Sequence, residues 1–297
     1  MGMRKKQIRI YLGKHFRMFW EKKYWSTFII SAIISLVVSY VQSVNMFKYN
    51  IQTWEGITVL ISAAIWIGIF NSVQLICRER ETLKHEHRTG LHISSYFISH
   101  VIFQAGICIV EAFILLIISA RFLEYPTNAL FINTKMEFFV TYFLTILAAD
   151  VVGLMLSSMV RTTELAMTIM PFLLIFELIF SGSFFRINGP IGQLSAATIC
   201  EYSMTAACIS TDYNNLEDTE KYKIIQKLHA MIENQDLPVT YDQVEQLVEE
   251  NYDVPFIDAY SHTRLNLVKQ WGALVIHAMI TALIGILALK LIDFDKR

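Results

Sequence analysis

Long apolar stretches alternate with short polar links along most of this chain of 297 residues. Crossing the roughly 30 Å hydrocarbon core of a bilayer takes about 20 apolar residues in a helix, which satisfies its own backbone hydrogen bonds there. Six stretches are long enough or nearly so, and they predict an all-α membrane protein with six transmembrane helices. The stretches are Tyr24–Val44, about Thr53–Cys77, Tyr96–Phe122, about Phe138–Val160, the shorter Glu164–Phe180, and Trp271–Ile292.

The composition agrees with this pattern. Hydrophobic residues make up 54% of the chain and charged residues 17%. A soluble domain carries about 25% charged residues, so the membrane class is favoured over the soluble one. Five prolines and twelve glycines argue against the disordered and fibrous classes.

Basic residues are unevenly distributed, and this distribution predicts the orientation. They gather before the first stretch and in the link Arg78–Ser95, and Arg161 lies in the next link on that side. The last link on the opposite side, Ser181–Gln270, carries thirteen acidic and six basic residues. Because Lys and Arg favour the cytoplasmic side, we expect both termini to be cytoplasmic and residues 181–270 to lie outside.

Residues 1–23 combine basic side chains with apolar ones such as Ile8, Tyr11 and Phe19. This combination is typical of an amphipathic helix that lies on the inner face of a membrane. The alternative is a basic anchor that only fixes topology.

The outer insertion has its own organisation. Ile191–Ser210 is too polar and too interrupted to span, and it predicts a re-entrant or interfacial helical pair. Leu216–Asn234 shows apolar residues at helical spacing, and a capping box of Thr240 and Gln243 predicts a second helix ending near Asn251. A small helical hairpin is therefore expected outside the membrane.

Two cysteines of this insertion, Cys200 and Cys208, lie where a disulfide could persist. Eight residues on one straight helix correspond to a rise of about 12 Å, which is too far to bridge. A disulfide therefore requires a bend between the two cysteines, and both alternatives stay open.

The inner segment 78–94 is dense in charge and leads directly into the third stretch. Glu81 and Lys84, three residues apart, favour a short surface helix, and Gly90 is placed as its C-terminal stop. Such a helix suits docking on a soluble partner. From these residues alone, a solvated basic loop that only fixes topology is the stronger interpretation.

This segment resembles the coupling-helix motif of type-2 ABC transporter permeases, especially the G-type group. The resemblance rests on Glu79-Arg80, then Lys84, Glu86 and Gly90, followed by Tyr96-Phe97. A second, weaker match is Phe180-Ser181-Gly182 with Phe184-Phe185, then Pro190, Ser195 and Tyr202, which is similar to the re-entrant outer loop of the family. The chain departs from the family at Gln104 and Gly106, where an acid and a proline are common. The resemblance implies that the residues coupled to an ATPase are Glu79, Arg80, Lys84, Glu86, Arg88 and Gly90.

The resemblance also implies partners: a second permease, identical or related, and two ABC ATPase subunits that bind ATP and Mg. The sequence contains no G-x-x-x-x-G-K-[ST] phosphate-binding loop, so we expect no cofactor bound directly and no ATP hydrolysis by this chain alone. Membrane lipids are expected contacts, and nucleic acid is not. A multi-pass protein of a bacterial plasma membrane is the expected location. We divide the chain into an interfacial helix (1–23), five spans with the coupling segment (24–180), the outer insertion (181–270), and the sixth span with a cytoplasmic tail (271–297).

Three acidic residues fall within the predicted spans: Glu111, Asp150 and Glu177. A carboxylate in the middle of a membrane costs on the order of 3 kcal/mol, so these side chains should face protein, water or a partner. A functional reading is contact with a cation, a proton or the substrate. The structural reading is a hydrogen bond between helices. The triplet His85-Glu86-His87 is not expected to bind metal, because residues two apart do not face one another on a helix.

Three function classes follow. The first is the permease of an exporter that moves amphipathic cargo such as a lipid, a peptide or a drug-like molecule. The second is a membrane scaffold or sensor whose outer hairpin binds a ligand. The third is a membrane enzyme using Glu111, Asp150 or His277, for which the sequence shows no converging catalytic cluster. The permease is the leading hypothesis.

Overall fold

The computed structural model describes residues 2–21, 25–42, 46–181, 190–235, 241–252 and 256–294. Within these ranges the fold is helical, apart from an isolated bridge between Tyr49 and Glu217. The α-helices are α1 (Gly2–Glu21), α2 (Ser26–Val41), α3 (Asn50–Ser72), α4 (Leu75–Arg88), α5 (Ile93–Phe122), α6 (Thr134–Met159), α7 (Thr163–Phe180), α8 (Ile199–Ser210), α9 (Thr219–Gln235), α10 (Tyr241–Asn251) and α11 (Arg264–Phe294). Short 3-10 turns cover Pro190–Ala197, Tyr213–Asn215 and Asp258–Tyr260.

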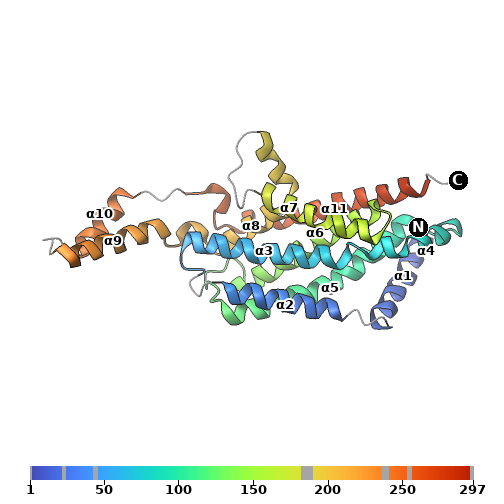
Figure 1. The fold of residues 1–297 in the computed structure, drawn as a ribbon, viewed down its shortest axis with the longest axis horizontal. Coiled ribbons are helices and arrows are strands. Elements are labelled where there is room, and N and C mark those ends of the chain that lie inside the picture. Colours follow the sequence, from blue (N-terminus) through green and yellow to red (C-terminus); the bar gives the residue numbers. More distant parts are fainter. Residues whose placement is uncertain are drawn as a thin grey trace.

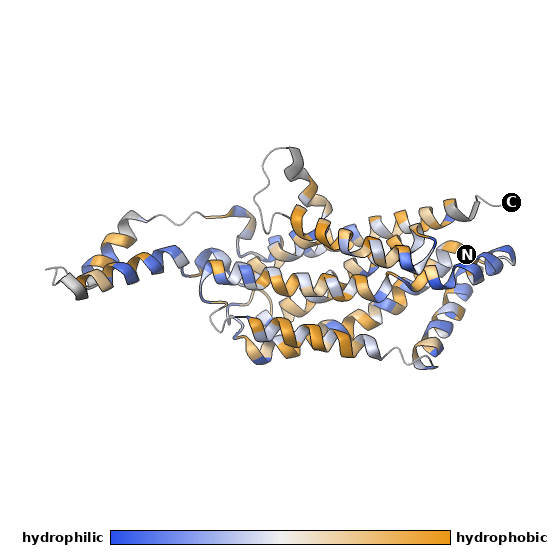
Figure 2. Ribbon diagram, in the orientation of Figure 1, coloured by the Kyte–Doolittle hydropathy of each residue, from blue (hydrophilic) through white to orange (hydrophobic). Residues whose placement is uncertain are grey.

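The long helices run side by side in an elongated bundle (Figure 1). Helices α1 and α4 and the end of α11 lie at one end of the bundle, and α9 and α10 extend from the other (Figure 1). We call these the α4 end and the hairpin end. Hydropathy follows the same axis: apolar residues dominate the middle of the bundle, and polar residues dominate α4 and α9 (Figure 2).

Five helical stretches of the described chain are long and apolar enough to cross a membrane. The number is six if α1 and α2, which meet at 72°, count together as one broken span. Helix α2 has only 16 residues, so it falls short of a span by itself. The apolar stretches therefore predicted a multi-pass membrane protein correctly. The last helix begins at Arg264, seven residues before the predicted start at Trp271.

Helices α3 and α6 make the closest crossing in the bundle core. A Cβ atom at Gly68 would collide with the carbonyl oxygen of Ile146, and one at Gly153 would collide with the hydroxyl of Ser72. Small residues allow membrane helices to approach until their backbones touch, which gains van der Waals contact and polar contact across the interface. Accordingly, the Ser72 hydroxyl donates a 2.6 Å hydrogen bond to the Asp150 carbonyl.

Helix α8 lies inside the bundle, packed against α3, α6 and α11. Cys200 and Cys208 both belong to this single helix and are both free thiols. The alternative of a disulfide between them is therefore wrong. An uninterrupted helix keeps two cysteines eight residues apart at too great a distance to bridge.

The hairpin of α9 and α10 lies where the sequence predicted two helices, although Thr240 of the predicted capping box lies outside the described residues. Its base is tied to the start of α3. The Asn50 side chain donates to Asp218 at 2.7 Å, and Asn50 Oδ1 accepts from the Thr219 backbone at 3.1 Å. Asp218 in turn caps α9 by accepting from the backbone of Glu220 at 2.8 Å. The Thr219 hydroxyl accepts from the Ile51 backbone at 3.3 Å, so each helix helps to cap the other.

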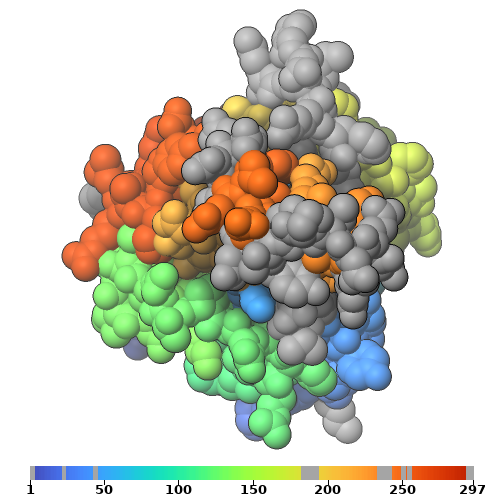
Figure 3. Space-filling view, turned by 90° about the vertical axis from the view of Figure 1, so that its left-hand side faces the viewer, coloured from blue at the N-terminus to red at the C-terminus, as the bar shows by residue number. Residues whose placement is uncertain are grey.

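The hairpin end also brings distant segments of chain together. Seen from that end, the beginning of α11 lies beside the link between α5 and α6 (Figure 3). Trp271 stacks on Phe131 with ring centroids 5.9 Å apart, and Arg264 donates to the Leu130 carbonyl.

Candidate functional site

Helix α4 continues the direction of α3 after a short break at Val73 and Gln74. It ends at Arg88, and Gly90, two residues later, has a φ of 105°, a conformation that L side chains rarely adopt. The backbone N–H of Gly90 donates to His87, and that of Leu91 donates to Glu86. This is a Schellman arrangement, which satisfies carbonyls left free at a helix end. The predicted glycine stop and the predicted Glu81–Lys84 pair, at 2.8 Å, are both confirmed.

One side of α4 is joined to the end of α6 by reciprocal capping. The Ser157 hydroxyl accepts from the backbone N–H groups of Ile76 and Cys77, both at 3.1 Å, at the start of α4. The buried Arg80 guanidinium donates to the carbonyls of Ser158 and Val160 at the end of α6. Groups that each helix terminus leaves unsatisfied are thus bonded by the other helix. The turn between α6 and α7 is thereby fixed to α4.

A second side of α4 is joined to α1 and α5 through two carboxylates. The Tyr96 hydroxyl donates to Glu79 at 3.1 Å, and the Tyr11 hydroxyl donates to Glu86 at 2.6 Å. Lys14 lies between the two carboxylates, 3.5 Å from Glu79 and 3.7 Å from Glu86. Burial, and then the bond to Glu86, raise the pKa of Tyr11, which lies on α1, outside the five long spans. Tyr11 therefore stays a hydrogen-bond donor at physiological pH.

The tip of α4 is held by Gln7 of α1. The Gln7 amide donates to the Gly90 carbonyl at 3.0 Å and accepts from the backbone of His92 at 3.2 Å. Helix α1 therefore contacts α4 at Glu79, at Glu86 and at the turn that follows α4.

The predicted coupling residues divide into two groups. Glu79, Arg80 and Glu86 face other helices, whereas Arg88 and Gly90 are exposed and Lys84 is half-buried. Arg80 is only 4% exposed, and its guanidinium is bonded to carbonyls at the end of α6. It therefore does not belong to the exposed face of α4. The exposed residues of α4 are Arg78, Glu81, Thr82, His85, His87 and Arg88.

Each of the acidic residues in the spans has a partner on another helix. Asn71 donates to Glu111 at 2.6 Å, and Gln104 donates to Asp150 at 2.9 Å. One oxygen of each carboxyl group is buried without a hydrogen bond. Gln104, which stands where the family often has an acid, is therefore the partner of a buried acid on α6.

Glu177 binds the first turn of α8. Its carboxylate accepts from the Ile199 backbone at 2.8 Å and is 3% exposed. Thr198, which precedes α8, makes no capping bond with its own side chain. Glu177 thus supplies from α7 the capping oxygen that α8 lacks. His277, a candidate residue of the membrane-enzyme hypothesis, donates a hydrogen bond to the Ala197 carbonyl at 3.0 Å.

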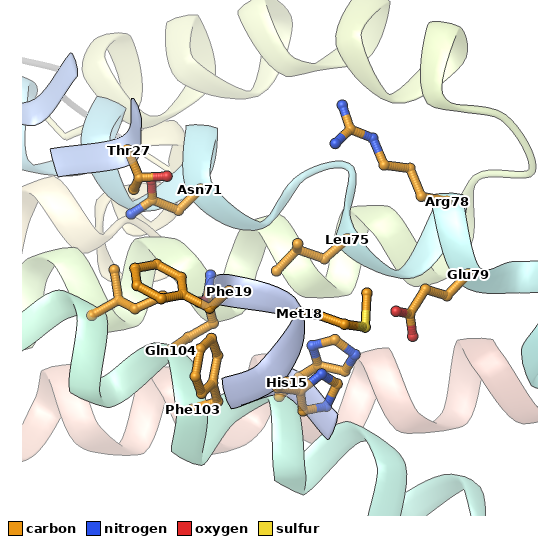
Figure 4. Close-up of a pocket in the computed structure, with 12 residues that line it drawn as sticks. His15, Met18, Phe19, Thr27, Asn71, Leu75, Arg78, Glu79, Phe103 and Gln104 are labelled. Carbon is orange, nitrogen blue, oxygen red and sulfur yellow. The ribbon is translucent and has the colours of Figure 1, made fainter. Parts of the chain in front are cut away.

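A cavity of about 140 Å³ lies between α1, α2, α5 and the junction of α3 with α4 (Figure 4). Imidazole, amide and aromatic side chains line it, including a pair of buried histidines, His15 and His100, with ring centroids 3.9 Å apart. Burial, and then the charge of Lys14, lower the pKa of His15 to about 4. Ser99 already donates to Tyr96, so His15 Nε2 is the donor in its 3.2 Å contact with Ser99.

Sequence reasoning missed the residues that hold the site together. The patterns in the sequence singled out neither Gln7, Lys14 nor Asn71, and Gln104 was noted only as a departure from the family. Glu137, which accepts from the backbones of Leu130 and Phe131 at 2.7 and 2.8 Å, was missed as well. The one available signal was the cost of burying polar groups. This cost indicates that a buried polar side chain has a hydrogen-bond partner, but it does not indicate which residue that partner is.

Comparison with known proteins agrees with this architecture. The family model of the ABC-2 type transporter matches residues 6–190, which run from α1 to the turn after α7. A similar protein is the ABC transporter ATP-binding/permease protein Rv1747 of Mycobacterium tuberculosis. It is 26% identical over 161 residues, which are 52% of this chain and 19% of that protein. The chain thus covers about one fifth of the relative, and the matched family region is a membrane domain, with no ATPase domain identified in it. With its multi-pass helical bundle and its charged helix α4 after α3, the chain belongs to the ABC-2 type transporter family as a transmembrane permease.

Proposed function

We propose that the chain is the permease subunit of an ABC exporter and that α4 is the coupling helix on which a separate ATPase subunit acts. The observation that carries the proposal is the two-sided character of α4. One side is bonded to α1, α5 and α6, and the other presents exposed polar side chains at the end of the bundle. A helix with these two sides can receive a force from a partner and pass it on to the spans.

Two routes lead from α4 into the bundle. Arg80 and Ser157 join α4 to the turn between α6 and α7. Glu79, through Tyr96, joins it to the beginning of α5. ATP and Mg bound by the partner would drive its closure, and displacement of α4 would then bias the bundle between two arrangements. A partner shifts such an equilibrium only by as much as it prefers one arrangement.

The remaining expectations complete the proposal. The α4 end, with both termini, faces the cytoplasm of a bacterial plasma membrane, and 181–270 faces outside. A second permease, identical or related, supplies the other half of the substrate path. The cargo is amphipathic: a lipid, a peptide or a drug-like molecule. Division of the chain at residues 23, 180 and 270 follows from this arrangement.

Glu111, Asp150 and Glu177 are proposed to position helices. Each bonds a group on another helix, and Glu177 orients α8, which is buried beside α3, α6 and α11. Replacing Glu177 with Gln should preserve most of this role, because one amide oxygen can still accept from Ile199.

The test is purification in mild detergent followed by measurement of ATPase activity and of transport in vesicles. The double variant His85→Ala with Arg88→Ala changes only the exposed face of α4 and should lose the ATPase subunit. Arg80→Met should keep that subunit and its ATP hydrolysis but transport less per ATP. Lys223→Ala on α9 is the matched control at the hairpin end. The proposal fails if wild type carries no ATPase subunit under any gentle condition.

The second candidate function is a scaffold or sensor with a ligand-binding outer hairpin. A cavity of about 510 Å³ between α9 and the link that precedes α3 favours it. Lys48, Tyr49, Glu217 and Tyr222 are among its lining residues. This reading gains if ligand binding at the hairpin is measurable while no ATP-dependent transport occurs in the presence of an ATPase subunit.

A further inference from the structure

Two cavities at the α4 end adjoin one another. The inner cavity, described above, lies under α1 (Figure 4). The second, of about 210 Å³, lies between α2 and α3, and we call it the α2–α3 groove. The two share four lining residues, Thr27, Asn71, Leu75 and Arg78. A ligand of suitable shape can therefore occupy both.

The α2–α3 groove changes in polarity along its length. Its deeper part is lined by Ile34, Ile67 and Phe70, and the part near α4 is lined by Ser26, Gln74 and Arg78. Its apolar side chains are partly exposed, and those of Ile30 and Phe70 are each 42% exposed. Along the groove, apolar side chains give way to hydroxyl and cationic groups. This change in polarity matches the change from acyl chain to headgroup across a membrane leaflet.

Opposite charges stand next to each other where the groove meets the inner cavity. Arg78 lines both spaces, whereas Glu79 lines only the inner one. Among the described residues, the Arg78 guanidinium is hydrogen-bonded only to Gln74. Tyr96 and Lys14 both contact Oε2 of Glu79, and no described residue is hydrogen-bonded to Oε1. Figure 4 shows the two side chains leaving α4 in different directions, with Glu79 toward His15 and Met18.

The chemistry of the inner cavity suits a small cation. Phe19 and Phe103 line it together with the carboxylate of Glu79, and His15 is neutral at pH 7 because its pKa is lowered to about 4. An ammonium group is attracted to aromatic ring faces and to a carboxylate. On the groove side, an arginine is the side chain best suited to pair with a phosphate.

We propose that the two cavities form one site for a phospholipid with a zwitterionic headgroup from the adjoining leaflet. One acyl chain lies in the α2–α3 groove, the phosphate pairs with Arg78, and the ammonium enters the inner cavity beside Glu79. One cation and one anion in the lining match a phosphate and an amine, whereas an anionic lipid would leave Glu79 facing a headgroup that carries no amine. The site does not depend on the proposed export function, since a lipid can occupy it with no ATPase present.

The experiment is native mass spectrometry of the purified chain alone, titrated with phosphatidylethanolamine or phosphatidylglycerol of identical acyl chains. Wild type should bind phosphatidylethanolamine more tightly. Arg78→Ala should weaken its binding roughly tenfold, as expected for the loss of about 1.4 kcal/mol. Arg121→Ala, which removes an exposed arginine near the other end of α5, is the matched control and should bind as wild type does.

Two further variants separate the parts of the site. Ile30→Trp should fill the groove and displace the lipid, whereas Ile33→Trp, on the same helix but outside the groove and 58% exposed, should not. Glu79→Gln should abolish the preference for phosphatidylethanolamine while leaving phosphatidylglycerol binding unchanged. Equal binding of the two lipids by wild type overturns the proposal, as does an equal effect of Ile30→Trp and Ile33→Trp. Because no ATPase takes part, failure here leaves the export proposal standing, and the reverse also holds.

Discussion

The two ends of the bundle are attached to it in different ways. At the α4 end, helix α4 is bonded to three other helices, and several of the groups involved are buried. At the hairpin end, α9 is tied to the start of α3 through Asn50 and Asp218, and beyond this base it packs on α10. Breaking a buried polar contact costs more free energy than breaking an exposed one. The α4 end should therefore move with the spans, and the hairpin should open locally.

The largest expected effect comes from a change that loosens both ends. Gly68→Ala places a methyl group against the Ile146 carbonyl at the α3–α6 crossing and should destabilise the protein by about 3 kcal/mol. The free energy of unfolding, measured by SDS titration in mixed micelles, checks this. Gly106→Ala, where a Cβ meets no atom within 4 Å, is the control and should be neutral or slightly stabilising. Equal effects at the two glycines would contradict the close crossing.

The next change should affect the α4 end alone. Arg80→Met keeps a long side chain but removes the donor to the Ser158 and Val160 carbonyls, and it should cost about 2 kcal/mol. Amide hydrogen exchange should rise in α4 and in the turn after α6, and stay unchanged in α9. Arg88→Ala, exposed on the same helix, should change stability by less than about 0.5 kcal/mol. If both variants change the free energy of unfolding equally, the buried capping by Arg80 contributes nothing to stability.

The attachment of α1 should depend on pH. The pKa of His15 is about 4 in the folded protein, below its ordinary value of 6.5. The stability from keeping this ring neutral is therefore present above pH 6.5 and is lost as pH falls toward 4. The loss should be about 2 kcal/mol between pH 7 and pH 4.5. The free energy of unfolding, measured at both pH values for wild type and His15→Gln, checks this. The variant should lose the part of the pH dependence that His15 causes. His85→Gln, exposed on α4, should keep it.

The smallest effect is expected at the hairpin. Asp218→Ala removes the cap of α9 and the partner of Asn50, and it should cost about 1 kcal/mol. Hydrogen exchange should rise in α9 while α4 keeps its protection. Lys223→Ala, exposed on α9, serves as the control. A rise in the exchange of α4 would show that the two ends of the bundle are coupled.

Apolar stretches located the helices to within seven residues because twenty apolar residues in a row leave the backbone little alternative in a membrane. The charge pattern likewise located α4 and its glycine stop. It did not reveal that Arg80 faces inward, because its acceptors lie 78 and 80 residues away on α6. For Glu111 and Asp150 the apolar stretches predicted the depth in the membrane. Their partners, Asn71 and Gln104, depend on how the helices are rotated, and a single sequence does not encode that rotation locally.

The continuity of α3 with α4 determines how far the two helices together can reach. The stretch Asn50–Arg88 has 39 residues, and at about 1.5 Å per residue it reaches on the order of 58 Å if it runs straight. A bilayer with its headgroups is about 40–45 Å thick. A rod of this length exceeds the membrane by more than two helical turns. The tip of α4 can therefore extend beyond the lipid phosphates, and a soluble partner can bind it without first displacing headgroups.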